Sequence, residues 1–110
     1  MGTSIPEPAP TAGSGPDLWP QVIQRHHGEP AFTRAAVERH RFGVEKYGRG
    51  LKAYNGRNAI VDALQEALDL VVYLEQVKCE ATDGWTTAKA CEMQAKAVDM
   101  ANTLALMVGA

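Results

Sequence analysis

Residues 60–77, IVDALQEALDLVVYLEQV, decide the fold of this chain. At roughly 100° per residue on a helical wheel, their apolar side chains cover an arc of about 220°, much wider than the stripe of a surface helix. These side chains are Ile60, Val61, Ala63, Leu64, Ala67, Leu68, Leu70, Val71, Val72, Leu74 and Val77. A helix of this kind is packed by neighbours on most sides. Glu75 is the one polar residue inside the arc, near the predicted end of the packing.

Local signals predict helices on both sides of this segment. Asn58 caps the central helix, which runs to about residue 80 and is broken at 83–84, where an Asp-Gly pair stands. Asp17 caps a short helix from residue 18 that ends near residues 27–28. Pro30 begins a helix that continues to Tyr47 and is stopped by Gly48.

A fourth helix is expected from Thr86 or Thr87 almost to the end of the chain. Its apolar positions recur at steps of three and four residues: Ala90, Met93, Ala97, Met100, Leu104 and Met107. No stretch alternates like a β-strand over more than a few residues. The sequence therefore predicts an all-α fold, a bundle of about four helices.

The length of 110 residues suits one domain, which we place at 17–110. Residues 1–16 hold four prolines and three glycines with almost nothing apolar, and they are expected to form a disordered tail. A domain this small buries a modest core, so association into a homodimer or homotetramer would stabilise it.

Charge and hydropathy exclude some partners. The formal charge is −2 and the pI is near 5.9, which argues against nucleic acid polymers and anionic membranes. No apolar run approaches the roughly 20 residues that a membrane span needs. The two cysteines, Cys79 and Cys91, are expected to be free thiols in a reducing cytoplasm, although a disulfide between them is possible on paper.

A polar strip remains on the central helix outside the apolar arc. Its members follow at steps of four, three, four and three residues: Asp62, Glu66, Asp69, Tyr73 and Gln76. Like charges at these spacings destabilise a helix, and no Lys or Arg precedes Lys78 to offset them. Carboxylates one turn apart suit Mg²⁺, with Mn²⁺ as a substitute. The alternative is a strip that simply faces water.

The preceding helix offers two further carboxylates. Glu38 and Glu45 are seven residues apart and share a face. If this helix packs antiparallel to the central one, either glutamate can complete a metal cluster with Glu66 and Asp69. The alternative is local pairing of both glutamates with Arg41.

The connection at 48–57, GRGLKAYNGR, is basic and glycine-rich. Phosphates require positive charge and hydrogen-bond donors, and nucleobases stack on aromatic rings. The candidate substrate-binding residues in and beside it are Lys46, Tyr47, Lys52, Asn55 and Arg57. The alternative is an ordinary solvated loop.

Three stretches together resemble MazG-like proteins of the all-alpha NTP pyrophosphatase superfamily, especially the short versions in bacteriophage genomes. They are RFGVEKYG at 41–48, NGR at 55–57 and DALQEALDLVVYL at 62–74. The ExxD pair formed by Glu66 and Asp69 is the most specific match. The family usually carries an EExxE-type cluster on the preceding helix, where this chain has Glu38 and Glu45 at a different spacing.

The resemblance implies a helical homodimer or homotetramer that binds Mg²⁺ through carboxylates on two helices. It implies cleavage of a (d)NTP between the α- and β-phosphates, giving a (d)NMP and pyrophosphate, in the cytoplasm or in the host cytoplasm if the chain is phage-encoded. Glu66, Asp69 and Glu45 would be catalytic, with help from Glu38 and Asp62 in holding metal.

A non-catalytic function is the second expectation. The chain would then be a helical dimerisation or adaptor module of the same fold, with the alanines and methionines of the fourth helix as its working surface. Metal binding distinguishes the two, because only a catalytic site should gain thermal stability with Mg²⁺.

Overall fold

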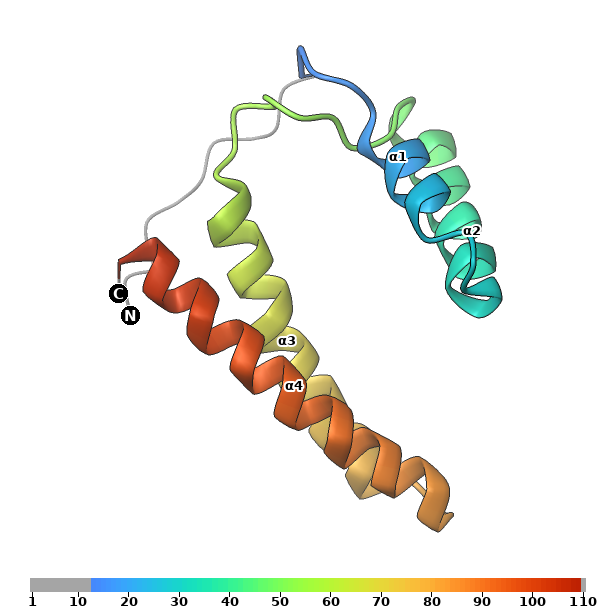
Figure 1. The fold of residues 1–110 in the computed structure, drawn as a ribbon, viewed down its shortest axis with the longest axis vertical. Helices are drawn as coiled ribbons and strands as arrows, with labels where there is room; N and C mark the ends of the chain where they lie inside the picture. Colours follow the sequence, from blue (N-terminus) through green and yellow to red (C-terminus); the bar gives the residue numbers. More distant parts are fainter. Residues whose placement is uncertain (1–12, 110) are drawn as a thin grey trace. The chain divides into compact units, whose positions relative to one another are not determined.

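The computed structural model describes residues 13–109, and in these residues the chain has four α-helices and no β-strand (Figure 1). The helices are α1 (Leu18–Arg25), α2 (Pro30–Tyr47), α3 (Ala59–Glu80) and α4 (Gly84–Val108). The predicted all-α class is therefore confirmed. None of these helices is both long and apolar enough to cross a membrane.

The described residues form two compact units, 13–57 with α1 and α2, and 58–109 with α3 and α4. The organisation of 17–110 as one domain stays a prediction. Residues 1–12 of the predicted tail lie outside the described residues.

Side-chain caps set the helix ends. Asp17 accepts a hydrogen bond from the backbone N–H of Trp19, and Asn58 accepts from Ile60 and Val61, as predicted. Gly48 ends α2 with a left-handed backbone, φ 78°. α4 was predicted to begin at Thr86 or Thr87, but it begins at Gly84. The carboxylate of Asp83 accepts a hydrogen bond from the N–H of Thr86 at 2.7 Å and caps the helix one residue before Gly84. These hydrogen bonds also lower the pKa of Asp83.

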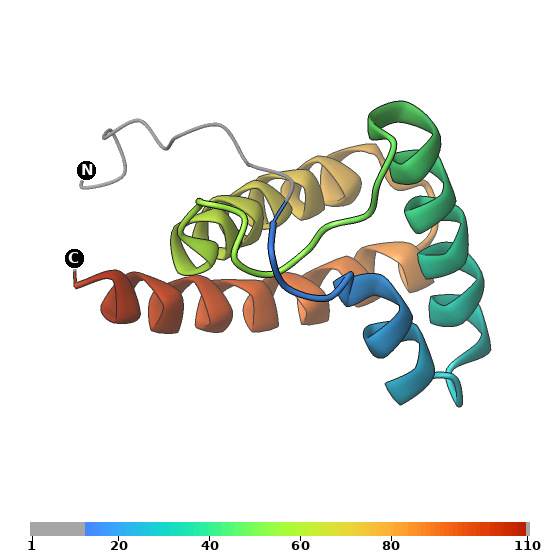
Figure 2. The same ribbon diagram turned by 90° about the horizontal axis from the view of Figure 1, so that it is seen from above.

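α3 and α4 lie side by side as an antiparallel hairpin (Figures 1 and 2). Its buried residues are Leu64, Ala67 and Leu74 on α3 and Ala90, Ala97 and Ala101 on α4. Alanines at the seam leave room for the two backbones to approach closely. α4 covers only part of the apolar arc of α3, since Leu68, Leu70 and Val72 remain exposed.

In the other unit, α1 packs against α2 and is also tied to the 48–57 connection. The N–H of Leu18 donates to the carbonyl of Leu51 at 2.8 Å, and the N–H of Gly15 donates to the carbonyl of Ala53 at 3.1 Å. Residues 13–16, which were expected to belong to the disordered tail, thus include backbone groups that pair with this connection. In the same unit, Nε2 of His40 lies 3.0 Å from Oδ2 of Asp17.

Gly50 leaves no room for a side chain beside this Asp17–His40 pair. A Cβ at this position would lie 2.7 Å from both Oδ1 of Asp17 and Nε2 of His40. Gly50→Ala is therefore expected to lower the free energy of unfolding by about 1–3 kcal/mol, as overpacking typically does.

Gly43→Ala is the matched control in urea unfolding followed by circular dichroism. Gly43 lies within α2, and a Cβ added there would meet nothing within 4 Å beyond its chain neighbours and the adjacent backbone of α2, so the same change should raise stability by about 0.5–1 kcal/mol. Equal effects of the two substitutions would contradict this account of the Asp17–His40 contact.

Candidate metal site on α3

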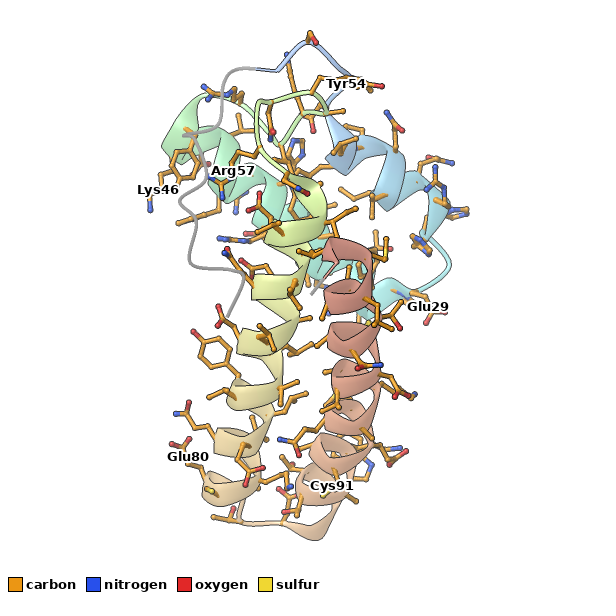
Figure 3. All side chains as sticks on the ribbon, turned by 90° about the vertical axis from the view of Figure 1, so that its left-hand side faces the viewer. Glu29, Lys46, Tyr54, Arg57, Glu80 and Cys91 are labelled. Carbon is orange, nitrogen blue, oxygen red and sulfur yellow. The ribbon has the colours of Figure 1, made fainter. Side chains whose placement is uncertain are left out.

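The acidic strip of α3 lies on the helix face directed away from α4. Leu64, Ala67 and Leu74 point into the seam, and the strip is about half a turn from them. Glu80 continues the strip and, in Figure 3, points away from α4. Glu66 and Asp69 are both exposed. The order of the apolar and acidic positions along α3 therefore directs two carboxylates outward from one turn of a rigid helix.

Glu66 and Asp69 have no hydrogen bond or ion pair within residues 13–109. Asp62 is half-buried and does have a partner. Carboxylate oxygens without internal partners are available to a hard cation. Mg²⁺ in nucleotide-hydrolysing sites is commonly held by one or two carboxylates, water and the substrate's phosphates, so the Glu66–Asp69 pair suits that ion.

The two glutamates of α2 pair locally. Arg41 lies 2.6 Å from a carboxylate oxygen of Glu38 and 3.8 Å from one of Glu45, and all three side chains are exposed. The hydrogen bond and charge of Glu38, with the charge of Glu45, raise the pKa of Arg41. Within residues 13–109 no three His, Cys, Asp or Glu side chains are grouped so as to hold a metal. Completion of the site by Glu38 or Glu45 stays a prediction.

The predicted substrate-binding residues belong to the end of α2 and the connection after it (Figure 3). Lys46 lies over the rings of Phe42 and Tyr47, with its Nζ 5.7 Å and 5.3 Å from the two ring centres. The side chain of Asn55 accepts a hydrogen bond from the N–H of Arg57 at 3.1 Å and shapes the turn at Gly56, φ 85°.

Lys52 takes part in the connection through its backbone, because it forms an isolated antiparallel bridge with Asp17. Tyr47 is exposed, and so is Tyr54, which has a left-handed backbone with φ 56°. This connection is thus a shaped loop, and its role toward phosphate stays a prediction.

Glu75 faces α4, although it lies where the packing was expected to end. Its carboxylate accepts from Nε2 of Gln94 at 3.0 Å and from Nζ of Lys78 at 3.3 Å. Gln94 also donates to the backbone carbonyl of Val71 at 3.0 Å. The bond from Gln94, and then Lys78, lower the pKa of Glu75. This cluster could not be predicted from the sequence, because Gln94 lies 19 residues after Glu75, on the other helix.

The Glu75 cluster is expected to make the stability of the hairpin depend on pH. A carboxyl whose pKa is lower in the folded protein stabilises the fold above its unfolded pKa, near 4.5, and this contribution is lost as the pH falls through the folded pKa. The thermal midpoint of the wild type is thus expected to fall more steeply below pH 4.5 than that of Glu75→Gln. Parallel acid profiles in thermal melts would refute this role of Glu75.

A groove of about 580 Å³ lies where α1 ends and α2 begins. It is lined by Val22, His26, Glu29, Pro30, Ala31 and Phe32. His26 contacts the edge of the Phe32 ring, with 5.8 Å between the ring centres. None of the predicted site residues lines this groove. The two cysteines are free and exposed, as expected from the sequence.

The fold and site define an all-α chain whose helical hairpin presents an acidic strip on its outer face. No family model, no curated protein and no solved structure matches this chain. Its function is therefore inferred from the chain's own residues and from the sequence resemblance of residues 41–74.

Proposed function

We propose that the chain is a metal-dependent nucleoside triphosphate pyrophosphohydrolase that converts a (d)NTP to a (d)NMP and pyrophosphate. The observation that carries the proposal is the state of Glu66 and Asp69: one turn apart, exposed, and without a hydrogen bond or ion pair in residues 13–109. Two carboxylates three residues apart on one helix face repel each other, and a bound cation would offset that repulsion. The resemblance of residues 41–74 to MazG-like proteins supports the same conclusion.

The reaction needs few protein groups beyond this pair. Glu66 and Asp69 would hold a divalent cation, with Glu45, Glu38 or Asp62 as further ligands. When bound, the cation would supply positive charge for the phosphates and lower the pKa of the attacking water. The bond from water oxygen to the α-phosphorus forms, the bond from that phosphorus to the bridging oxygen breaks, and pyrophosphate leaves while water loses a proton. Lys46, Lys52 and Arg57 supply positive charge for the phosphates.

The test is pyrophosphate release by the full chain from a panel of NTPs and dNTPs. Mg²⁺ should support turnover, Mn²⁺ should substitute, and excess EDTA should abolish it. Release of orthophosphate in place of pyrophosphate would refute the proposed bond cleavage. Absence of turnover across the panel at saturating Mg²⁺ would refute the enzymatic function.

The exposed methionines of α4 favour a second candidate, a non-catalytic dimerisation or adaptor module. Such a module has no use for a cation on α3. Its melting temperature should then be the same in Mg²⁺ and in EDTA, whereas a metal enzyme should be stabilised by the ion through mass action.

A further inference from the structure

An exposed aromatic ring on α2 is contacted by two cations. The ring belongs to Phe42, which is 50% exposed. The guanidinium carbon of Arg39 lies 5.3 Å from the centre of this ring, and Nζ of Lys46 lies 5.7 Å from it. Steps of three and four residues bring the three side chains to one face of the helix. We call Arg39, Phe42 and Lys46 the cation–ring cluster.

The acidic residues of α2 do not neutralise this cluster. Glu38 and Glu45 both pair with Arg41. Arg39 and Lys46 have no ion pair and no side-chain hydrogen bond within residues 13–109. Two positive charges beside one exposed ring are therefore available to an anion from outside the chain.

A ring holds a cation differently from a carboxylate. The negative face of the ring attracts the cation but leaves its charge in place. A guanidinium over a ring also keeps N–H donors at its edge, and these suit the oxygens of a phosphate. Phe42 can therefore fix the positions of Arg39 and Lys46 while both remain able to bind an anion.

The spacing of the two cations indicates the kind of anion. Arg39 and Lys46 are seven residues apart, which corresponds to about 10 Å along the helix axis. An anion with charges distributed along a chain can contact both cations, whereas a single phosphate group is better placed to contact one. The cluster is thus complementary to a chain of phosphates.

We propose that Arg39 and Lys46, positioned by Phe42, bind the phosphate chain of the nucleoside triphosphate. This inference rests on the proposed function and deepens it. Lys46 was expected from the sequence to bind substrate, whereas Arg39 is a new phosphate-binding residue. Phe42 is a positioning residue, because it acts through the two cations.

Binding of inorganic tripolyphosphate tests the cluster without catalysis. The measurement is isothermal titration calorimetry of the full chain in EDTA. The wild type should bind tripolyphosphate about tenfold or more tightly than orthophosphate, and Arg39→Gln should weaken tripolyphosphate binding about fivefold or more. Absence of binding by the wild type, or equal affinity for the two anions, would overturn the proposal.

Arg34→Gln is the matched control for Arg39→Gln. It removes the same charge from an exposed position on the same helix, and no ring or acidic side chain holds Arg34 in the part of the chain that the structure describes. Its affinity for tripolyphosphate should stay within about twofold of the wild type. Equal losses for the two variants would reduce the effect to net charge and contradict a defined site.

Phe42→Leu tests the positioning role. It keeps an apolar side chain but removes the ring that Arg39 and Lys46 share, so tripolyphosphate binding should weaken about threefold or more. Phe42→Trp should preserve binding, since Trp is the best ring for a cation. Phe32→Leu is the control, because Phe32 is 42% exposed on the same helix and its described ring contact is with His26. Equal binding by Phe42→Leu and the wild type would remove Phe42 from the site.

Kinetics with a (d)NTP and Mg²⁺ connect the cluster with the proposed reaction. Arg39→Gln should raise KM about fivefold or more and leave kcat within about twofold, as expected when ground state and transition state lose the same contact. A lower kcat at unchanged KM would contradict phosphate binding by Arg39. Tripolyphosphate binding through Arg39 without any pyrophosphate release would refute the hydrolysis but keep this phosphate site, whereas turnover with an unchanged KM would refute the site alone.

Discussion

Glu66→Gln is expected to lower the rate of pyrophosphate release at least about 100-fold at fixed Mg²⁺. A metal ligand contributes several kcal/mol of transition-state stabilisation, and each 1.36 kcal/mol corresponds to about a factor of ten in rate. The amide keeps the size of the side chain and removes its charge. Rates are measured by coupled pyrophosphate detection at saturating nucleotide.

Glu92→Gln is the matched control, because it removes the same charge from an exposed position on α4, outside the strip. Its rate should stay within about twofold of the wild type. Without metal, Glu66→Gln should also raise the melting temperature slightly, because it removes repulsion from Asp69 three residues away. Loss of activity with gain of stability would mark Glu66 as a functional residue. Full activity of Glu66→Gln would remove it from the site.

Leu64→Ala is expected to reduce the free energy of unfolding by about 2–5 kcal/mol, the usual cost of truncating a buried leucine. Leu64 is 3% exposed and belongs to the cluster with Ala67 and Ala101, against which Leu104 and Val108 pack. The alanines on the facing helix are too small to fill the space that the leucine would vacate. The measurement is urea unfolding at one protein concentration.

Leu68→Ala makes the same chemical change one turn further along α3, where the side chain is 38% exposed. Its cost should be clearly smaller, because less of the side chain leaves the protein interior. Both leucines belong to α3, so the comparison reports on the α3–α4 seam within one chain. Equal losses for the two variants would show that α4 covers a different side of α3.

Most helix ends were predictable because caps act over a few residues. Asp17, Gly48 and Asn58 each end or begin a helix through a contact within four positions. The start of α4 was predicted two residues late, since Gly84 disfavours a helix and the two threonines are themselves acceptable caps. In the structure the carboxylate of Asp83 accepts a hydrogen bond from the N–H of Thr86, so Asp83 is the cap and the helix begins at Gly84.

The alanines and methionines of α4 show what a periodic pattern leaves open. Steps of three and four residues identified both sets as apolar, but the seam takes Ala90, Ala97 and Ala101 and leaves the methionines about half exposed. Which apolar row of a helix is buried becomes known only when the helix that packs against it is known. The role of Glu75 was hidden for the same reason, since its partner Gln94 comes from the other helix. The sequence predicted that the acidic strip shares one face of α3, whereas the exposure of Glu66 and Asp69 and any further ligands did not follow from it.

Titration of the full chain with Mn²⁺, followed by the electron paramagnetic resonance signal of the free ion, tests the metal site most directly. The chain should bind Mn²⁺ saturably at an ionic strength of about 0.15 M, where exposed charges are screened beyond about 8 Å. Glu66→Gln/Asp69→Asn should abolish that binding, and Mg²⁺ should compete for it. The control Glu92→Gln/Asp99→Asn removes two acids from α4 and should bind as the wild type does. Equal binding by the two double variants would contradict a cation site on α3.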